Sequence, residues 1–166
     1  GYFMPKRYIS REEAIALVAR MYEKFDGKYI EKYSLLSRGD NRSYLIEQLK
    51  MLIPKEMGKP YRWGATGPNS YDCSGLVYTL YGKIGISLPR VSRDQAKAGV
   101  YVPKDSLQYG DLVFFAADGK TVNHVGIYVG NGEFVHAPST GDVVKISSLK
   151  TGYYSRTYFT ARRVIR

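Results

Sequence analysis

From residue 111 to its C-terminus the chain is a series of short β-type runs, and this pattern limits the possible folds most strongly. The runs are bounded by Gly, Asn, Asp or Ser and read DLVFFAA, HVGIYVG, EFVHAP, DVVKIS and RTYFTARRVI. Strands joined by such short connections pair antiparallel, and these strands follow helical segments in the sequence. The order predicts an α+β fold in which N-terminal helices pack on a central antiparallel sheet.

Two helical segments are expected in the first part of the chain. Residues 9–25 form a capped amphipathic pattern with one apolar stripe, and Asp26-Gly27 ends it. The polar stretch SRGDNRS then predicts a break before a second helix around residues 43–53. Pro54 should end that second helix, because proline lacks the N–H group that a helix needs.

A third helix begins near Cys73, with Ser70 or Asp72 as its cap and Gly85 in the left-handed position that closes it. Cys73 is the only cysteine, which excludes an intramolecular disulfide and the usual zinc and iron–sulfur patterns. A free cysteine is often simply a buried apolar residue. A helix start and a nearby histidine, however, both favour the reactive thiolate form of a cysteine. Cys73 is therefore either a buried core residue or a nucleophile.

The segment HVGIYVGNGEFVHA predicts a β-hairpin, whose turn decides which side chains share a face. A two-residue turn at Asn131-Gly132 would place His136 among the apolar side chains of the facing strand. A three-residue loop, 130–132, pairs Val129 with Glu133 instead and separates an apolar face from a polar one. The sequence therefore predicts the three-residue loop.

In this register the chain's only two histidines lie on the polar face of the hairpin. His136 lies opposite Gly126, which leaves open space, and diagonal to His124 at about 7–8 Å. The pair could be a metal site, two exposed residues, or a catalytic base with its orienting partner. A metal needs a further ligand, for which Asp72 or Cys73 would have to be recruited. With Cys73 at a helix start, the roles of nucleophile, base and orienting partner are all filled.

Three blocks of the sequence resemble the NlpC/P60 family of bacterial cell-wall cysteine peptidases. They read GKPYRWGATGPNSYDCSGLVYTLYGKIGISLPRVSRDQ, YGDLVFFA and NHVGIYVGNGEFVHAP. The resemblance implies a small papain-like peptidase domain over residues 43–166, preceded by an N-terminal helical extension over residues 1–42. It further implies a Cys-His-His triad that cleaves peptidoglycan stem peptides through a thioester. The most favoured target is the bond between D-γ-glutamate and a diamino acid, either diaminopimelate or lysine.

The resemblance also assigns roles residue by residue. It implies that Cys73 is the nucleophile, His124 the base and His136 the third polar residue, with the Tyr61 hydroxyl near the active site. The positions that match the substrate groove are Asp72, Ser74, Ser92 and Trp63.

Several neighbouring residues have more than one interpretation. Trp63, Tyr78 and Tyr81 also suit packing in the core, because large aromatic side chains dominate core area. Arg90 and Arg93 either meet a substrate carboxylate or are solvated. Two further residues have structural readings alone: Ala65 replaces the family's usual second glycine, which is tolerated unless its backbone is left-handed, and Asp111 starts a strand.

The charge and hydropathy of the chain bear on its partners and location. The net charge is +10, but the cations are dispersed and form no nucleic-acid motif, so an anionic cell wall suits the chain better than nucleic acid. No apolar run is long enough to span a membrane. The chain opens on Gly1 with no export signal, and processing or truncation would account for both. We expect an extracytoplasmic, secreted or wall-associated monomer without a cofactor.

Two other functions use the same residues. An acyl or amide transferase would employ the same Cys-His chemistry, and a catalytically silent wall-binding module would keep the fold. The silent module is disfavoured because all three catalytic positions, Cys73, His124 and His136, carry reactive residues.

Overall fold

The computed structural model describes residues 28–166, and of their side chains those of residues 41–166. The helix predicted over residues 9–25 lies outside this range. The chain divides into two units, residues 1–41 and 42–166. Everything described below about the sheet and the site belongs to the second unit.

Helix α2 runs without interruption from Lys28 to Glu56, and it corrects two predictions. The break at SRGDNRS is wrong, because this stretch has no proline and its one glycine costs a helix only about 1 kcal/mol relative to alanine. The stop at Pro54 is also wrong, since the proline lies inside the helix. Tertiary contacts hold this last turn: the Glu56 carboxylate accepts a hydrogen bond from the Tyr71 hydroxyl at 2.8 Å and pairs with Lys83 at 3.3 Å.

Helix α3, Cys73–Lys83, begins and ends as the sequence predicts. Asp72 is its N-cap, and the side chain accepts a hydrogen bond from the Gly75 N–H. Gly85, just past the end of the helix, has a φ of 83°, a conformation that glycine adopts without strain. The apolar face of α3 is fully buried and consists of Leu76, Val77, Leu80 and Tyr81.

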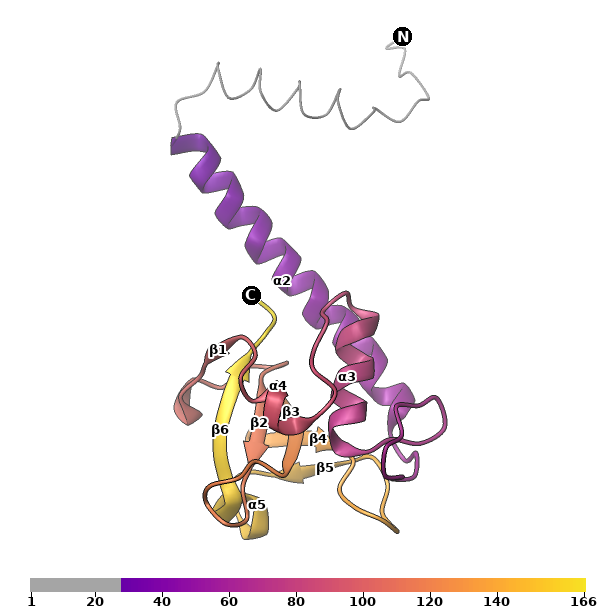
Figure 1. Cartoon of the computed structure of the whole chain (residues 1–166). Coiled ribbons are helices and arrows are strands. Elements are labelled where there is room, and N and C mark those ends of the chain that lie inside the picture. The colour runs from indigo at the N-terminus through magenta and orange to yellow at the C-terminus, as the bar shows by residue number, and fades with distance from the viewer. Residues whose placement is uncertain (1–27) are drawn as a thin grey trace. The chain divides into compact units, whose positions relative to one another are not determined.

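The sheet has six strands in the order β1-β6-β2-β3-β4-β5, and every neighbouring pair is antiparallel. The strands are β1 (Val100–Tyr101), β2 (Leu112–Phe115), β3 (His124–Gly130), β4 (Glu133–His136), β5 (Lys145–Ser148) and β6 (Tyr158–Arg163). Figure 1 shows this sheet beside α3, which confirms the predicted α+β class. Elements that the sequence patterns did not predict are β1, α4 (Ser92–Gln95), the 3-10 turn η1 (Lys104–Ser106) and α5 (Gly152–Thr157).

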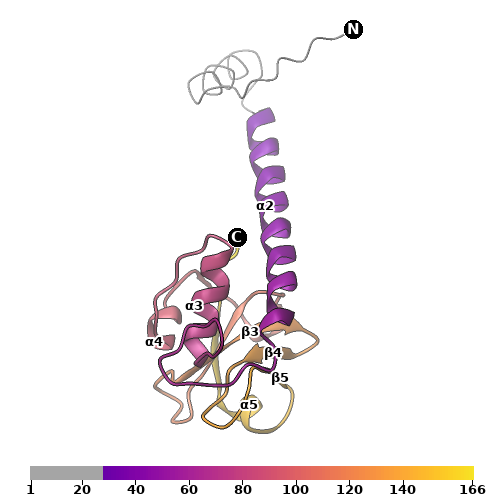
Figure 2. The same ribbon diagram turned by 90° about the vertical axis from the view of Figure 1, so that its right-hand side faces the viewer.

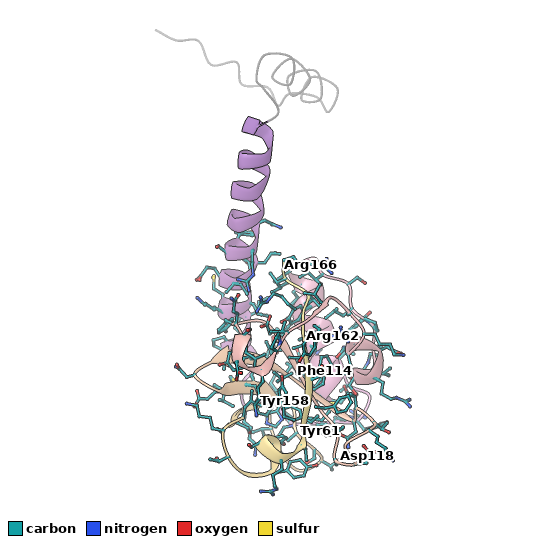
Figure 3. All side chains as sticks on the ribbon, turned by 90° about the vertical axis from the view of Figure 1, so that its left-hand side faces the viewer. Tyr61, Phe114, Asp118, Tyr158, Arg162 and Arg166 are labelled. Carbon is teal, nitrogen blue, oxygen red and sulfur yellow. The ribbon has the colours of Figure 1, made fainter. Side chains whose placement is uncertain are left out.

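Apolar side chains cover both faces of the sheet. Helix α3 and the final turns of α2 pack on one face, around buried residues such as Leu49, Phe114 and Ile127. In Figure 2, α3 and α4 lie side by side on this side of the sheet, and Figure 3 shows Phe114 in the middle of the domain. A smaller cluster on the other face includes Phe134 and is covered by Tyr154 of α5.

The β3–β4 hairpin has the predicted register but reaches it by a different turn. Ile127 pairs with Val135, so the side chains share faces as the sequence predicts. The turn itself has two residues, Asn131-Gly132, both with positive φ, and Gly130 pairs with Glu133. A bulge between Tyr128 and Gly130 supplies the extra residue that shifts the register by one. The predicted three-residue loop is therefore wrong.

The face that carries the histidines is not the open polar surface that the sequence suggests. His136 is completely buried, and its ring packs against that of Phe134 at a centroid distance of 4.5 Å. Nor does Gly126 leave open space: a Cβ there would come within 2.4 Å of the Phe134 ring. The glycine makes room for Phe134, which in turn supports His136.

Asp111, which the sequence predicts only to start a strand, has a structural role. It is completely buried just before β2, and both of its carboxylate oxygens accept hydrogen bonds at 2.8 Å from the Arg163 guanidinium. This pair fixes the start of β2 to β6.

Candidate active site

Cys73 is the first residue of α3 and is half-buried. The backbone N–H groups of Ser74 and Val125 both interact with its sulfur and lower its pKa, but burial and the negative charge of Asp72 outweigh them and raise the pKa overall. The thiol form is therefore the resting state at neutral pH. Because Val125 directly follows His124, the start of β3 lies beside the sulfur.

The Asp72 carboxylate organises the loop that leads into α3. Its Oδ1 accepts a hydrogen bond from the Gly75 N–H at 2.6 Å, and its Oδ2 accepts one from the Gly64 N–H at 2.9 Å. The same loop is fixed by the Ala65 carbonyl, which accepts from the Asp72 N–H at 3.0 Å. Within residues 28–166, Asn131 is the one non-glycine residue with positive φ, so the alanine at position 65 is not strained.

Arg90 binds Asp72 rather than a free surface site. Its guanidinium donates to the two carboxylate oxygens at 2.6 and 3.0 Å and to the Ser74 hydroxyl at 2.9 Å. Burial raises the pKa of Asp72, but Arg90 and the backbone N–H groups of Gly75 and Gly64 hold it below its ordinary value. The solvated interpretation of Arg90 is wrong, because its guanidinium is bound to the buried Asp72 carboxylate, which the sequence does not reveal. Contact with a substrate carboxylate stays a prediction for Arg90 and Arg93, which both line the groove that contains Cys73.

The two histidines form a direct contact. Nε2 of His124 lies 2.7 Å from Nδ1 of His136, and Nε2 of His136 lies 2.8 Å from the Ser147 hydroxyl. Burial lowers the pKa of His124 to about 4, and burial together with the neighbouring His124 lowers that of His136 to about 3. Both rings are therefore neutral at physiological pH.

Tyr154 covers the histidine pair, and the sequence patterns gave no signal for it. Its ring meets that of His136 edge-on at a centroid distance of 4.8 Å and stacks on that of His124 at 5.9 Å. Phe115 lies on another side of His124, at 5.7 Å. These rings explain why the imidazoles are desolvated. The sequence did not indicate Ser147 either, since a serine in a short strand has no distinguishing pattern.

Tyr61 and Trp63 occupy different environments on the same loop. Burial raises the pKa of Tyr61, and the charges of Cys73 and Asp72 raise it further, which places the hydroxyl in the electrostatic field of Cys73. Trp63 is 85% exposed, so the alternative that it packs in the core is wrong. Tyr81 does pack in the core, with no exposure, whereas Tyr78 is 43% exposed.

A groove of about 630 Å³ brings most of the predicted site residues together. Its lining includes Tyr61, Trp63, Asp72, Cys73, Ser74 and Ser92. Arg93, Thr121 and Val122 also line an adjoining groove of about 380 Å³, whose other residues include the cations Lys97, Lys120 and Arg162. Figure 3 shows Arg162, one of these cations, with its side chain. Neither histidine is among the lining residues of these two grooves. Within residues 28–166, no three His, Cys, Asp or Glu side chains gather as metal ligands would.

The chain is similar to known proteins in sequence. The model of the NlpC/P60 family matches residues 58–163. The murein DD-endopeptidase MepH of Escherichia coli K12 is 43% identical over 118 residues, which cover 68% of this chain and 44% of the relative. A γ-D-glutamyl-L-lysine dipeptidyl-peptidase of Bacillus subtilis 168 is 43% identical over 109 residues, 64% of this chain and 37% of that protein. The chain thus spans less than half the length of either relative.

Solved structures agree with the sequence matches. The crystal structure of an NlpC/P60 family protein from Bacillus cereus superimposes with a TM-score of 0.71 at 41% identity, covering 73% of this chain and 40% of that one. The peptidoglycan hydrolase RipB of Mycobacterium tuberculosis gives a TM-score of 0.65 at 29% identity, covering 76% of this chain and 68% of that one. The family model spans most of the chain and agrees with these folds. The chain belongs to the NlpC/P60 family.

Proposed function

We propose that this chain is a cysteine endopeptidase that hydrolyses an amide bond in peptidoglycan stem peptides. The observation that carries the proposal is the position of Cys73, at the start of a helix and in the wall of a groove, with the N–H of Val125 at its sulfur. Val125 directly follows His124, which contacts His136. A thiol in this position can attack a carbonyl carbon that enters the groove. The alternative that Cys73 is merely a core residue does not explain its place in that wall.

Acylation starts from a neutral pair. Since the pKa of Cys73 is raised and that of His124 lowered, the thiol keeps its proton until a substrate carbonyl is in place. His124 then accepts the proton as the sulfur attacks, which is general base catalysis. The resulting C–S bond makes a tetrahedral intermediate with a negative oxygen.

The start of α3 offers hydrogen-bond donors for this oxygen. Gly75 N–H is taken by the Asp72 side chain and Leu76 N–H by the Asp72 carbonyl. The N–H groups at the very start of a helix have no partner inside it, so the Cys73 N–H is the proposed first donor to the developing charge. The Tyr61 hydroxyl serves as the second donor.

The intermediate collapses when His124 returns the proton to the leaving amine, and a thioester on Cys73 remains. Water, deprotonated by His124, attacks the thioester and releases the acid, so the enzyme regains its thiol. His136 holds the His124 ring in place throughout. Asp72, Ser74, Ser92 and Trp63 contact the substrate along the groove in this proposal.

The bond between D-γ-glutamate and diaminopimelate or lysine is the proposed target. It is supported by relatives whose names specify γ-D-glutamyl-L-lysine and DL-endopeptidase activities. One relative is instead named a DD-endopeptidase, so a bond to D-alanine is the competing target. The cations that line the adjoining groove suit an anionic wall polymer.

Three further proposals concern the domain bounds, the location and the assembly of the chain. The proposed peptidase domain is residues 43–166, and most of the N-terminal helical extension predicted over residues 1–42 lies outside the described residues. A peptidoglycan substrate requires the chain to work outside the cytoplasm, secreted or bound to the wall, and it acts as a monomer without a cofactor. None of the helices within residues 28–166 combines the length and hydropathy of a membrane span.

Product analysis on purified peptidoglycan tests the activity. Wild type should release peptide fragments, whereas Cys73→Ala should release none while keeping the circular dichroism spectrum of the folded chain. Release by the variant at the wild-type rate would contradict the proposal. Adding glycinamide as an amine acceptor separates hydrolysis from transfer, since a transferase would produce the glycinamide adduct as its main product.

A further inference from the structure

Ser147 is the last member of a hydrogen-bonded chain that starts at the proposed base. The chain runs from Nε2 of His124 to Nδ1 of His136 at 2.7 Å, and from Nε2 of His136 to Oγ of Ser147 at 2.8 Å. Ser147 lies on β5, where it pairs with Phe134 of β4. The strand ladder therefore fixes the position of its hydroxyl.

When His124 is protonated, the hydrogen bonds from His124 through His136 to Ser147 can be donated in one direction. Nε2 of His124 already contacts His136, so Nδ1 is the nitrogen left to take the proton of Cys73. After that transfer both nitrogens of His124 carry a proton, and Nε2–H must donate to Nδ1 of His136. His136 then has its own proton on Nε2, and that N–H needs an acceptor.

The opposite direction blocks catalysis. If His136 carried its proton on Nδ1, it would donate to Nε2 of His124, whose proton would then sit on Nδ1. A ring in that form faces the thiol with an N–H and has no lone pair there to accept a proton. The acceptor at Nε2 of His136 thus bears on which tautomer His124 adopts.

Few groups near His136 can be that acceptor. His136 has no exposed surface, so water is not freely available to it. Asp142 and Lys145 act on it through their charges, but the Asp142 carboxylate is bound by Lys145 at 2.6 Å. Tyr154 and Phe134 present aromatic rings at centroid distances of 4.8 and 4.5 Å. The Ser147 hydroxyl is the oxygen within hydrogen-bond distance.

We infer that Ser147 is a positioning residue for the reaction: its hydroxyl accepts the Nε2–H bond of His136 and thereby holds His124 in the tautomer that takes the proton of Cys73. This inference rests on the proposed role of His124 as base. No proton passes along the chain; one proton moves from sulfur to Nδ1 of His124, and His136 and Ser147 keep theirs. A serine that merely stabilised the fold would leave the tautomer unchanged.

Alkylation of Cys73 by iodoacetamide tests the inference without a peptidoglycan substrate, and the single cysteine makes the signal specific to one site. Ser147→Ala should lower the alkylation rate at neutral pH about 10-fold, the effect of losing one buried hydrogen bond, and Ser147→Thr should restore most of it. Ser148→Ala is the matched control, since this neighbouring hydroxyl contacts the Lys150 N–H instead and its loss should leave the rate unchanged.

The imidazole ¹⁵N spectrum supplies the decisive second readout, because the chain has only two histidines. In wild type both histidine rings should be neutral and carry their proton on Nε2. In Ser147→Ala, the forms of His136 and His124 with the proton on Nδ1 should become populated. An Nδ1–H form of His136 in wild type, or identical rates and spectra in Ser147→Ala, would overturn the inference. Neither outcome depends on which amide bond is cleaved, so this failure is distinguishable from failure of the proposed function.

Discussion

The Arg90 guanidinium donates two hydrogen bonds, of 2.6 and 3.0 Å, to the carboxylate of Asp72, the residue directly before the proposed nucleophile Cys73. Asp72 is almost completely buried, whereas Arg90 is about one-third exposed. Burial and the negative charge of Asp72 raise the pKa of Cys73, and the charges of Arg90 and Cys73 act on each other. The pair therefore affects both the loop geometry and the reactivity of the thiol.

Arg90→Gln should destabilise the domain and make Cys73 less reactive. Removing one partner of a largely buried ion pair leaves the other charge poorly compensated, and solvent at Arg90 reduces the cost to about 1–3 kcal/mol. The pH midpoint of iodoacetamide alkylation should rise, because the charge of Asp72 would act on the thiol unopposed. Urea unfolding and the alkylation profile measure the two effects.

Two other arginine variants make this result specific. Arg90→Lys keeps the charge but loses the two-pronged geometry, so it should fall between wild type and Arg90→Gln. Arg62→Gln removes an exposed arginine from the neighbouring loop and should change neither quantity. If Arg90→Gln and Arg62→Gln behaved alike, the pair would have no influence on the site.

Two glycine substitutions should have opposite effects. At Gly126 an added Cβ would lie 2.4 Å from the Phe134 ring and 2.9 Å from the Val135 carbonyl oxygen, so Gly126→Ala should push Phe134 against His136. Overpacking of this kind typically costs about 1–3 kcal/mol. At Gly82 of α3 nothing lies within 4 Å, so Gly82→Ala should stabilise the helix by up to about 1 kcal/mol.

Thermal melting and turnover of both variants check the glycine predictions. Gly126→Ala should lower the melting temperature and the rate of peptidoglycan cleavage together, whereas Gly82→Ala should raise the melting temperature and leave the rate unchanged. Equal melting temperatures for Gly126→Ala and wild type would mean that Phe134 moves without cost.

The histidine pair makes stability depend on pH. Histidine ordinarily has a pKa of 6.5, whereas burial lowers those of His124 and His136 to about 4 and about 3 in the folded chain. Below pH 6.5 the unfolded chain therefore binds protons that the folded chain does not. Stability is complete above pH 6.5 and falls as the pH drops toward the folded values.

Urea unfolding at pH 7 and pH 5 measures this effect. At about 1.4 kcal/mol per pH unit, each histidine should lower the unfolding free energy by about 2 kcal/mol over that range. His136→Phe removes one of the two groups and keeps an aromatic ring next to Phe134, so it should lose about 2 kcal/mol less than wild type. Parallel losses in the two proteins would show that His136 titrates normally in the folded chain.

The sequence predicted the elements whose signals are local. Asp72 as a cap and Gly85 after the helix depend on the residues immediately around them, and both are confirmed. The pairing of Ile127 with Val135 was predictable because a one-residue slip would turn every side chain of the strand over. The turn was not predictable, since the bulge between Tyr128 and Gly130 allows a two-residue turn with the same register.

Features that depend on tertiary contacts could not be predicted. Pro54 stays within α2 because Tyr71 and Lys83 hold Glu56 in the last turn. The partnership of Arg90 with Asp72 spans 18 positions in the sequence, and that of His136 with Ser147 spans 11. Neither spacing corresponds to the period of a helix or a strand, so the sequence pattern does not indicate these two contacts. The family resemblance supplied the catalytic roles, which remain predictions until the variants are measured.

Mass spectrometry of products from a defined stem peptide tests whether Cys73 cleaves the γ-glutamyl bond. With a peptide of L-alanine, D-γ-glutamate, a diamino acid and D-alanine, wild type should give two fragments separated at the γ-glutamyl bond, and Cys73→Ala should give intact substrate. Fragments separated at the D-alanine bond would keep the nucleophile but change the target. Equal cleavage by Cys73→Ala would rule out Cys73 as the nucleophile, because the reaction would then not need the thiol.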